Sequence, residues 1–216
     1  MTGKLYIVAT PIGNPADFSE RALTVLREVK LVAVEDTRHS GRLFNACSIN
    51  TPMLSCHDYN ETERIELLLG KVAAGDDIAL VSDAGTQLVS DPGFQLVRQA
   101  HARGITVVPV PGPSAVIAAL CSAGLPTDRF VFEGFLPHKK GRQTRWKAIA
   151  EEERTTVLYE SPHRLVKALE QMVEFVSPDR AVMVARELSK MHEQMVRGTA
   201  AEVLAYFHAH PDKVRG

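Results

Sequence analysis

The sequence is poor in cysteine, and its charges almost cancel. Cys47, Cys56 and Cys121 stand far apart, and no Cys-x-x-Cys pair occurs in the 216 residues. This spacing disfavours a zinc site, a redox couple and a disulfide framework, so we expect three reduced thiols and no bound metal. The net charge of -1 argues against a protein that coats nucleic acid nonspecifically, because that mode of binding neutralises many phosphates.

Long apolar segments are missing as well. No apolar run approaches the roughly 18 residues of a membrane span, and the N-terminus lacks the basic-then-apolar order of a secretory signal. We therefore expect a cytoplasmic protein with no membrane contact. Apolar residues make up 45% of the chain and charged residues 24%, so the chain can bury the core of one large domain or of two small ones.

Short apolar runs alternate with amphipathic segments in the first half of the chain. The runs typical of buried strands are residues 5–9, 31–34, 78–82 and 106–110. Between them, Asp17 and Glu20 resemble a capping box that opens a helix, and another helix is expected after Asn60. This alternation predicts an α/β fold with a mostly parallel, doubly wound sheet.

Alternate prolines at Pro109, Pro111 and Pro113 disfavour both helix and central strand, so we place a domain boundary near residue 112. This predicts an N-terminal domain of residues 1–112 and a C-terminal domain of residues 113–216. The second domain is also expected to be α/β. Its predicted strands are residues 130–133, 156–159, 182–186 and 194–197, and its predicted helices begin at Ser114, cover 140–152, begin at Ser161 and cover 199–209.

The last two predicted strands are joined by a short polar link at residues 187–193, which favours an antiparallel hairpin over another crossover. After the final helix the sequence closes on residues 210–216 with no strand that returns to the sheet. We therefore expect that the last strand of the C-terminal domain is missing and that the chain is truncated.

Polar turns follow the predicted strands of the first half, at residues 11–14, 35–38, 82–93 and 111–115. Because the carboxyl ends of parallel strands lie at one edge of a sheet, we expect these turns to converge on one crevice. In the longest turn Asp83 follows the strand directly, Gly85 allows a positive φ, and Asp91-Pro92 has the order of an N-cap and a first-turn proline.

Two common nucleotide-binding motifs are absent from the sequence. No Gly-x-Gly-x-x-Gly segment occurs, which disfavours a nicotinamide oxidoreductase. No Gly-x-x-x-x-Gly-Lys segment occurs either, which disfavours a phosphate-loop ATPase. The turns instead resemble those of a different class of protein.

The segments at residues 10–14, 35–38, 82–93 and 111–115 resemble the tetrapyrrole methylase superfamily of S-adenosylmethionine enzymes. Three further segments, at residues 134–137, 159–164 and 185–190, are similar to the branch that methylates the ribose 2'-hydroxyl of a cytidine in 16S rRNA of the small ribosomal subunit. Gln87 departs from the proline that is usual in this family. The resemblance implies a homodimer of two-domain subunits, with S-adenosylmethionine bound in a cleft between the domains and no metal.

The resemblance also implies which residues line the cofactor. In the first part of the chain they are Pro11, Gly13, Asp83, Ala84, Gly85, Thr86, Ser114 and Ala115, and on the wall of the second domain they are Phe135, Leu136 and Tyr159. Ordinary structural roles stay open for several of these residues. Asp83 can cap the turn that follows it, and the three apolar residues of the second domain can simply pack in its core.

Candidates for activating the ribose hydroxyl are the carboxylates of Asp36 and Glu160, with Arg38 and His163 as orienting residues or phosphate contacts. Each of them follows a predicted strand near the proposed cleft. The alternative for Asp36 is a cap on the helix that begins after Arg38.

The densest basic stretch of the chain, residues 138–147, predicts an RNA contact. Its candidate phosphate-binding residues are Lys139, Lys140, Arg142 and Arg145. The alternative is a solvated helix face neutralised by the acidic residues 151–153. For the whole protein, a methyltransferase of the same superfamily that acts on a tetrapyrrole or on a protein, and a noncatalytic S-adenosylmethionine sensor, remain alternatives to the rRNA enzyme.

Overall fold

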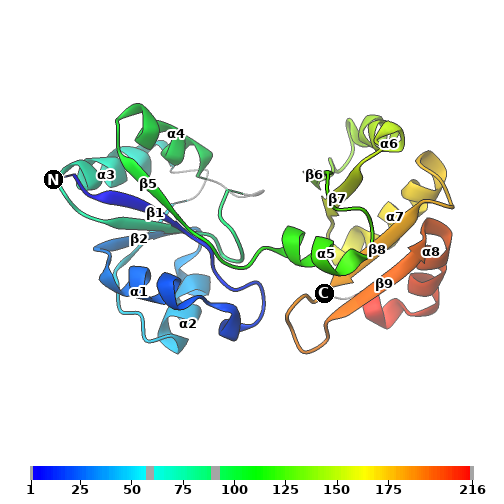
Figure 1. Cartoon of the computed structure of the whole chain (residues 1–216), viewed down its shortest axis with the longest axis horizontal. Helices are drawn as coiled ribbons and strands as arrows, with labels where there is room; N and C mark the ends of the chain where they lie inside the picture. Colours follow the sequence, from blue (N-terminus) through cyan, green and yellow to red (C-terminus); the bar gives the residue numbers. More distant parts are fainter. Residues whose placement is uncertain (1, 57–60, 89–92, 215–216) are drawn as a thin grey trace. The chain divides into compact units, whose positions relative to one another are not determined.

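The structure is a computed structural model, which describes residues 2–56, 61–88 and 93–214. The chain divides into two compact units, Met1–Ser114 and Ala115–Gly216, coloured blue to green and green to red in Figure 1. The sequence predicts a boundary near residue 112. Both units are built from helices and strands, as the predicted α/β fold class requires.

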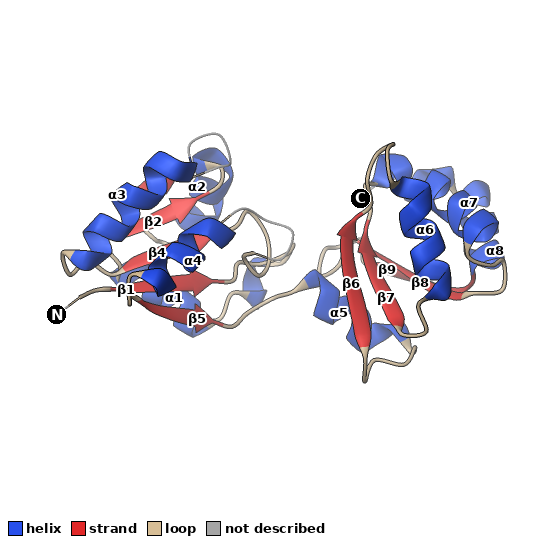
Figure 2. Ribbon diagram, turned by 90° about the horizontal axis from the view of Figure 1, so that it is seen from above, coloured by secondary structure: helices blue, strands red, loops and turns tan. Residues whose placement is uncertain are grey.

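Unit 1 contains one parallel sheet, with its strands side by side in Figure 2. Its order is β3-β2-β4-β1-β5, and every pairing of neighbouring strands is parallel. The strands are β1 (Lys4–Val8), β2 (Leu31–Val34), β3 (Met53–Ser55), β4 (Ile78–Val81) and β5 (Thr106–Val110). Four of them confirm the predicted runs, whereas β3 was not predicted because its three half-buried residues form no apolar run.

Helices cover both faces of this sheet. Leu68 of α3 and Leu96 of α4 are fully buried in one core, and Leu26 of α1 and Phe44 of α2 are buried in the other. The doubly wound topology is therefore confirmed, and Figure 1 shows the two helix pairs on opposite sides of the sheet. The helices are α1 (Glu20–Glu28), α2 (Thr37–Ala46), α3 (Glu61–Ala73) and α4 (Phe94–Ala102), with a short 3₁₀ helix, η1, at Pro15–Asp17.

Two helix starts differ from the prediction. The capping box of Asp17 and Glu20 is wrong, because the N-cap of α1 is Ser19, whose hydroxyl accepts from the Ala22 amide at 3.2 Å. The second is α4, which begins at Phe94 directly after Gly93, a residue with a φ of 111°. Asp91 and Pro92 themselves lie outside the described residues.

Unit 2 contains two small sheets. Strands β6 (Phe130–Phe135) and β7 (Thr155–Tyr159) pair in parallel, and β8 (Ala181–Arg186) and β9 (Gln194–Thr199) form the predicted antiparallel hairpin. One core gathers around Trp146 and Leu136, and the other around Leu169 and Phe207. The helices are α5 (Ala115–Ala123), α6 (Arg142–Glu151), α7 (Leu165–Phe175) and α8 (Ala200–Ala209), with 3₁₀ helices η2 (Pro162–Arg164) and η3 (Pro211–Val214).

Membrane spans and metal clusters are both absent from the described residues. None of the helices over residues 2–56, 61–88 and 93–214 has the length and apolar character needed to cross a membrane. Within the same ranges, no group of three or more His, Cys, Asp or Glu side chains is arranged to hold a metal ion. Cys47, Cys56 and Cys121 form no disulfide within the same described ranges.

Candidate functional site

The turns after β1 and β4 are joined at the carboxyl edge of the unit 1 sheet. The Thr10 amide donates to the Gly85 carbonyl at 2.9 Å, and the Gly85 amide donates back to the Thr10 carbonyl at 3.1 Å. The buried Thr10 hydroxyl also donates to the Ser82 carbonyl at 3.2 Å. Backbone pairing therefore fixes two turns that are far apart in the sequence against each other.

The turns after β2 and β5 reach the same place. The Asp36 amide, in the turn after β2, donates to the Asp83 carboxylate at 3.4 Å. From the other side, the Thr86 hydroxyl donates to the Pro113 carbonyl at 2.9 Å. The other three predicted turns thus touch the turn after β4, and the predicted convergence of the four turns at one sheet edge is confirmed. We call this set of turns, residues 10–14, 35–38, 82–86 and 111–114, the rim.

Two glycines allow the rim to pack this closely. Gly85 has a φ of 86°, which side-chain-bearing residues rarely adopt, and a Cβ atom there would lie 3.2 Å from a methyl group of Ile12. A Cβ on Gly112 would lie 2.9 Å from the Cβ of Ala9, so a side chain there would push the turn after β5 away from the residue that follows β1. Gly112, Gly13 and Ala84 are exposed, and the rim therefore offers backbone groups to solvent.

Asp83 lies half-buried within the rim. Its carboxylate accepts a hydrogen bond from the amide of Asp36, which lies in a different turn and is the N-cap of α2. This hydrogen bond joins two turns, whereas the alternative from the sequence is a cap within the turn of Asp83 itself. A half-buried carboxylate on an exposed rim can accept hydrogen bonds from hydroxyl or ammonium donors of a ligand.

Asp36 is the N-cap of α2, as the alternative from the sequence proposed. Its carboxylate accepts from the Arg38 amide at 2.8 Å and from the Arg38 guanidinium at 2.8 and 3.2 Å. The hydrogen bonds from Arg38 lower the pKa of Asp36 to about 2, and Asp36 in turn raises the pKa of Arg38. A carboxylate with so low a pKa is a weak proton acceptor.

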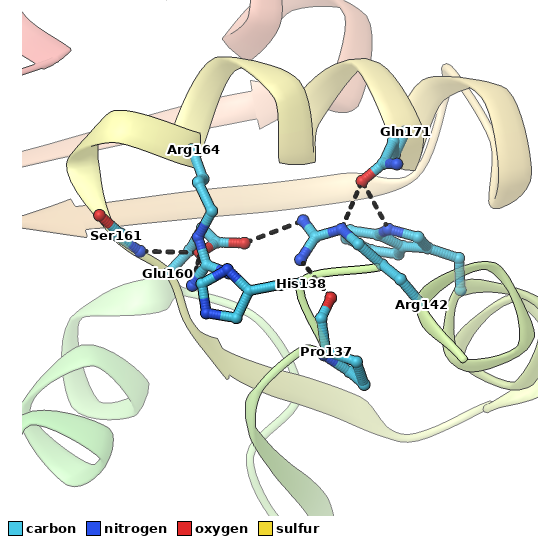
Figure 3. A network of polar contacts seen from close by, with 8 residues as sticks. Pro137, His138, Arg142, Glu160, Ser161, Arg164 and Gln171 are labelled. Carbon is cyan, nitrogen blue, oxygen red and sulfur yellow. Dashed lines mark hydrogen bonds and ion pairs between the residues drawn. The ribbon is translucent and has the colours of Figure 1, made fainter. Parts of the chain in front are cut away.

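Glu160, the other candidate for hydroxyl activation, lies in unit 2 and forms two ion pairs (Figure 3). Its Oε2 lies 2.9 Å from Arg142 Nη2, and its Oε1 lies 2.7 Å from Arg164 Nη2. The Ser161 amide also donates to Oε1 at 2.8 Å. Both oxygens are already engaged by cationic or amide donors, so the structure gives Glu160 the features of a structural anion and not of a proton acceptor.

The structure does not support the RNA contact predicted for Arg142. The side chain is only 6% exposed, and its Nε donates to Gln171 at 2.6 Å while Nη1 donates to the Pro137 carbonyl at 3.3 Å. Trp146 Nε1 donates to the same Gln171 oxygen at 3.2 Å. All three nitrogen atoms of the Arg142 guanidinium thus donate to partners inside unit 2, so the group is not available to a phosphate (Figure 3).

The other basic residues of this stretch are accessible. Lys139 and Lys140 are exposed, and neither forms an ion pair within the described part of the chain. Arg145 is 55% exposed and pairs with Glu133 at 3.3 Å. Of the acidic residues that could have neutralised the stretch, Glu152 pairs with Arg154 at 2.7 Å. One of the three acidic residues, 151–153, that the solvated-face alternative needs to neutralise the basic stretch is therefore already paired elsewhere.

The three apolar residues predicted on the second domain's wall differ in their surroundings. Leu136 is buried beside Trp146, as ordinary core packing requires. Phe135 is 55% exposed, and its ring centroid lies 5.3 Å from that of Tyr159, which also contacts Phe132 at 5.0 Å. Phe135 and Tyr159 end the paired strands β6 and β7, so they form an aromatic pair at a carboxyl sheet edge.

Sequence reasoning did not identify Gln171, which lies between Arg142 and Trp146 and accepts from both. A glutamine on a helix, well beyond the basic stretch in sequence, carries no recognisable pattern. The ion pair of Glu160 with Arg164 joins residues four apart, but Glu160 lies before η2 and not on a helix, so the helical spacing rule does not predict it.

A parallel sheet with four turns gathered at its carboxyl edge, followed by a second α/β unit, is the architecture of a known class of methyltransferases. The chain belongs to the tetrapyrrole (corrin/porphyrin) methylase family, whose model matches residues 4–204. The resemblance inferred from the motifs is thereby confirmed.

Solved structures of two enzymes share the fold. Cobalt precorrin-4 methyltransferase, a cobalamin biosynthetic enzyme, superposes with a TM-score of 0.71 at 19% identity, over 99% of this chain and 91% of that chain. Uroporphyrin-III C-methyl transferase from Thermus thermophilus, complexed with S-adenyl homocysteine, gives a TM-score of 0.64 at 19% identity, over 94% and 91%. At such identities the likeness concerns the fold alone.

Curated relatives are much more similar in sequence. Ribosomal RNA small subunit methyltransferase I of Pseudomonas aeruginosa is 54% identical over 99% of this chain and 76% of that protein. The protein of the same name from Escherichia coli O157:H7 is 51% identical over 99% and 75%. The one from Thermotoga maritima is 44% identical over 95% of this chain and 92% of its own length.

Proposed function

We propose that this protein is an S-adenosylmethionine-dependent methyltransferase that methylates the ribose 2'-hydroxyl of a cytidine in 16S rRNA of the small ribosomal subunit. The observation that carries the proposal is the 54% identity, over 99% of the chain, to a protein named for methylation of small-subunit ribosomal RNA. The choice of cytidine and of the 2'-hydroxyl rests on the motif resemblance.

The rim of unit 1 suits the methyl donor. S-adenosylmethionine supplies a methyl group on a cationic sulfonium, and it carries ribose hydroxyls and an ammonium group that need acceptors. Asp83 provides a half-buried carboxylate for such donors, and the exposed backbone of Gly13, Ala84 and Gly112 can contact the flat base edge-on. We assign the cofactor to the unit 1 rim residues Pro11, Gly13, Asp83, Ala84, Gly85, Thr86 and Ser114.

The cofactor contacts of Ala115, Phe135, Leu136 and Tyr159 stay predictions from the resemblance. Among them, Leu136 is the residue whose burial is explained by packing alone. Phe135 and Tyr159 offer an accessible aromatic pair, which suits a stacking role toward a nucleoside.

In this reaction the hydroxyl oxygen attacks the methyl carbon of a cationic sulfonium, the carbon–sulfur bond breaks to release S-adenosylhomocysteine, and the hydroxyl proton passes to solvent. The positive charge is therefore spread over a larger volume in the transition state. The protein's main contribution is then alignment of the hydroxyl and exclusion of water, with alignment worth roughly 7 to 11 kcal/mol by effective-molarity arguments. Asp36, with its pKa lowered to about 2, suits a hydrogen-bonding role toward the hydroxyl better than full proton removal. Arg38 is 87% exposed beside it and can contact a phosphate.

The RNA contact is assigned to the exposed cations of unit 2. Lys139, Lys140 and the half-exposed Arg145 can neutralise phosphates, whereas Arg142 is left out because it is buried. The family resemblance further suggests a cytoplasmic homodimer. Light scattering of the purified protein tests the dimer, which should give twice the 23.7 kDa of one chain.

The proposal is tested by methyl transfer from labelled S-adenosylmethionine to small ribosomal subunits that lack the modification. We expect label in 16S rRNA, recovered as 2'-O-methylcytidine after digestion to nucleosides. Large ribosomal subunits serve as the matched control and should stay unlabelled. Label that appears only in a porphyrin-like ring, or in no acceptor at all despite cofactor binding, would contradict the proposed function.

A further inference from the structure

The short segment that carries the exposed Lys139 and Lys140 is hydrogen-bonded to two arginines of unit 2, Arg142 and Arg164. We call residues 137–141, which join β6 to α6, the lysine turn. Arg142 donates from its guanidinium to the Pro137 carbonyl at 3.3 Å and from its amide to the Lys139 carbonyl at 3.2 Å. Arg164 Nη1 lies 3.0 Å from His138 Nδ1. The lysine turn is therefore bound at three of its residues by two arginines.

Both arginines form ion pairs with the same carboxylate, that of Glu160. Glu160, only 11% exposed, lies 2.9 Å from Arg142 and 2.7 Å from Arg164 (Figure 3). Without this anion, two guanidinium groups would lie side by side beneath a turn that already carries two lysines, and like charges at such distances repel strongly. Glu160 thus permits the arginines to hold the turn from inside the unit.

One carboxylate facing two guanidinium groups leaves one surplus positive charge beneath the lysine turn. Arg164 contributes it near the surface, because its side chain is 22% exposed whereas that of Arg142 is 6% exposed. A held turn, two exposed lysines and a partly buried surplus cation together favour a polyanion as the partner. A loose turn would have to be ordered when it binds, which weakens binding.

We propose that Glu160 and Arg164 are positioning residues that hold Lys139 and Lys140 in place for contact with rRNA phosphates. The inference rests on the proposed function and deepens it, because it moves Glu160 from hydroxyl activation to RNA recognition. Arg164 acts through the lysine turn and not by touching RNA itself. Its effect must therefore depend on the two lysines.

This dependence gives a decisive test. Binding of the full chain to small ribosomal subunits is measured at several salt concentrations for Arg164→Gln, for the double variant Lys139→Ala/Lys140→Ala, and for the triple variant. The matched control is Arg154→Gln, which removes another arginine–glutamate pair of unit 2, between Arg154 and Glu152, that has no described interaction with the lysine turn. Melting temperatures show which variants are folded.

We expect Arg164→Gln to weaken binding about tenfold and to lower the salt slope by roughly 0.7 to 0.9 for each phosphate that the lysines no longer neutralise. In the protein that lacks both lysines, the same substitution should have no further effect. Arg154→Gln should leave affinity and slope unchanged. Cofactor affinity, measured by calorimetry, should be unchanged in every variant, since the positioning concerns RNA alone.

Three results would overturn the inference. Arg164→Gln could weaken binding by the same factor with and without the lysines, which would make Arg164 a direct RNA ligand or a general structural residue. Arg164→Gln could leave binding unchanged, or the lysine double variant could do so, in which case the turn needs no holding or does not meet RNA. Methyl transfer by the unaltered protein reports separately on the proposed function.

A second variant keeps the test open if Arg164→Gln proves unstable. His138→Ala removes the turn's side of the interaction and leaves both ion pairs of Glu160 intact. It should weaken binding in the same direction, by a smaller factor, and again only when Lys139 and Lys140 are present. Equal weakening in the lysine-free background would overturn the inference.

Discussion

Replacing Arg142 by alanine tests whether this residue is a buried structural cation or an RNA-binding residue. In the structure Arg142 and Glu160 are 6% and 11% exposed and lie 2.9 Å apart, so solvent screens the pair little. Removing one partner of a buried ion pair typically costs about 3 to 5 kcal/mol, mainly because the other charge is left uncompensated. Here Glu160 keeps Arg164 and the Ser161 amide, which places the expected loss near the lower end, at about 3 kcal/mol.

The assay can report on unit 2 alone. Trp146 is the single tryptophan of the chain, it is fully buried, and the Arg142 guanidinium lies 5.9 Å from its ring centroid. Urea unfolding followed by Trp146 fluorescence therefore gives the free energy of unfolding of this unit by linear extrapolation. Lys139→Ala, an exposed neighbour on the same stretch, is the matched control and should change that free energy by at most about 0.5 kcal/mol.

The two variants should also differ in RNA binding. At a temperature where both are folded, Lys139→Ala should weaken binding and lower the salt slope, because one phosphate is left without its cation. A loss of less than about 1 kcal/mol for Arg142→Ala, the lower limit for a buried charged hydrogen bond, would refute the structural role. The refutation would be complete if the same variant bound RNA as poorly as Lys139→Ala.

Three further predictions concern the rim. Gly85→Val places a branched side chain at a φ of 86°, so calorimetry should show S-adenosylmethionine affinity reduced about tenfold or more; unchanged affinity would count against a cofactor role for this turn. NMR titration should give Asp36 a pKa of about 2, and in Arg38→Gln this pKa should return toward 3.8. The stabilisation from the ionised cap is then full above pH 3.8 and is lost as the pH falls through 2. A pKa of Asp36 near 3.8 in the unaltered protein would refute the pairing with Arg38. Thr86→Val removes the hydrogen bond to Pro113 and should lower the free energy of unfolding of unit 1 by about 1 kcal/mol in urea unfolding; no change would show that the bond does not hold the turns together.

The sheet of unit 1 could be predicted because its central strands are continuous apolar runs. Residues 32–34 and 78–81 are buried on both faces, and such runs differ clearly from the amphipathic helices between them. The edge strand at 53–55 escaped prediction, since three half-buried residues at an edge need no apolar pattern. Helix starts were less predictable, because Ser19 and Asp17 are equally good caps by residue type and only the backbone path selects Ser19.

The rim could also be predicted, because parallel topology alone brings the strand ends together. The role of Arg142 could not be. A basic stretch has the pattern of a solvated face whether or not one of its members turns inward, and only the fold brings Glu160 and Gln171 to Arg142. For Asp36 the sequence allows both a cap and a proton acceptor, and the structure favours the cap through the hydrogen bond from the amide of its near neighbour Arg38.

Binding of the methyl donor at the rim of unit 1 underlies the whole proposed function, and NMR mapping of amide groups can locate that binding. S-adenosylhomocysteine, added to the isotope-labelled full chain, should shift the amides of Gly13, Ala84 and Gly85 at the carboxyl edge of the sheet. The glycines at the opposite edge, Gly3, Gly75 and Gly104, should stay unmoved and serve as internal controls. Shifts confined to that opposite edge, or no shifts in the rim at saturating ligand, would contradict a cofactor site at the rim.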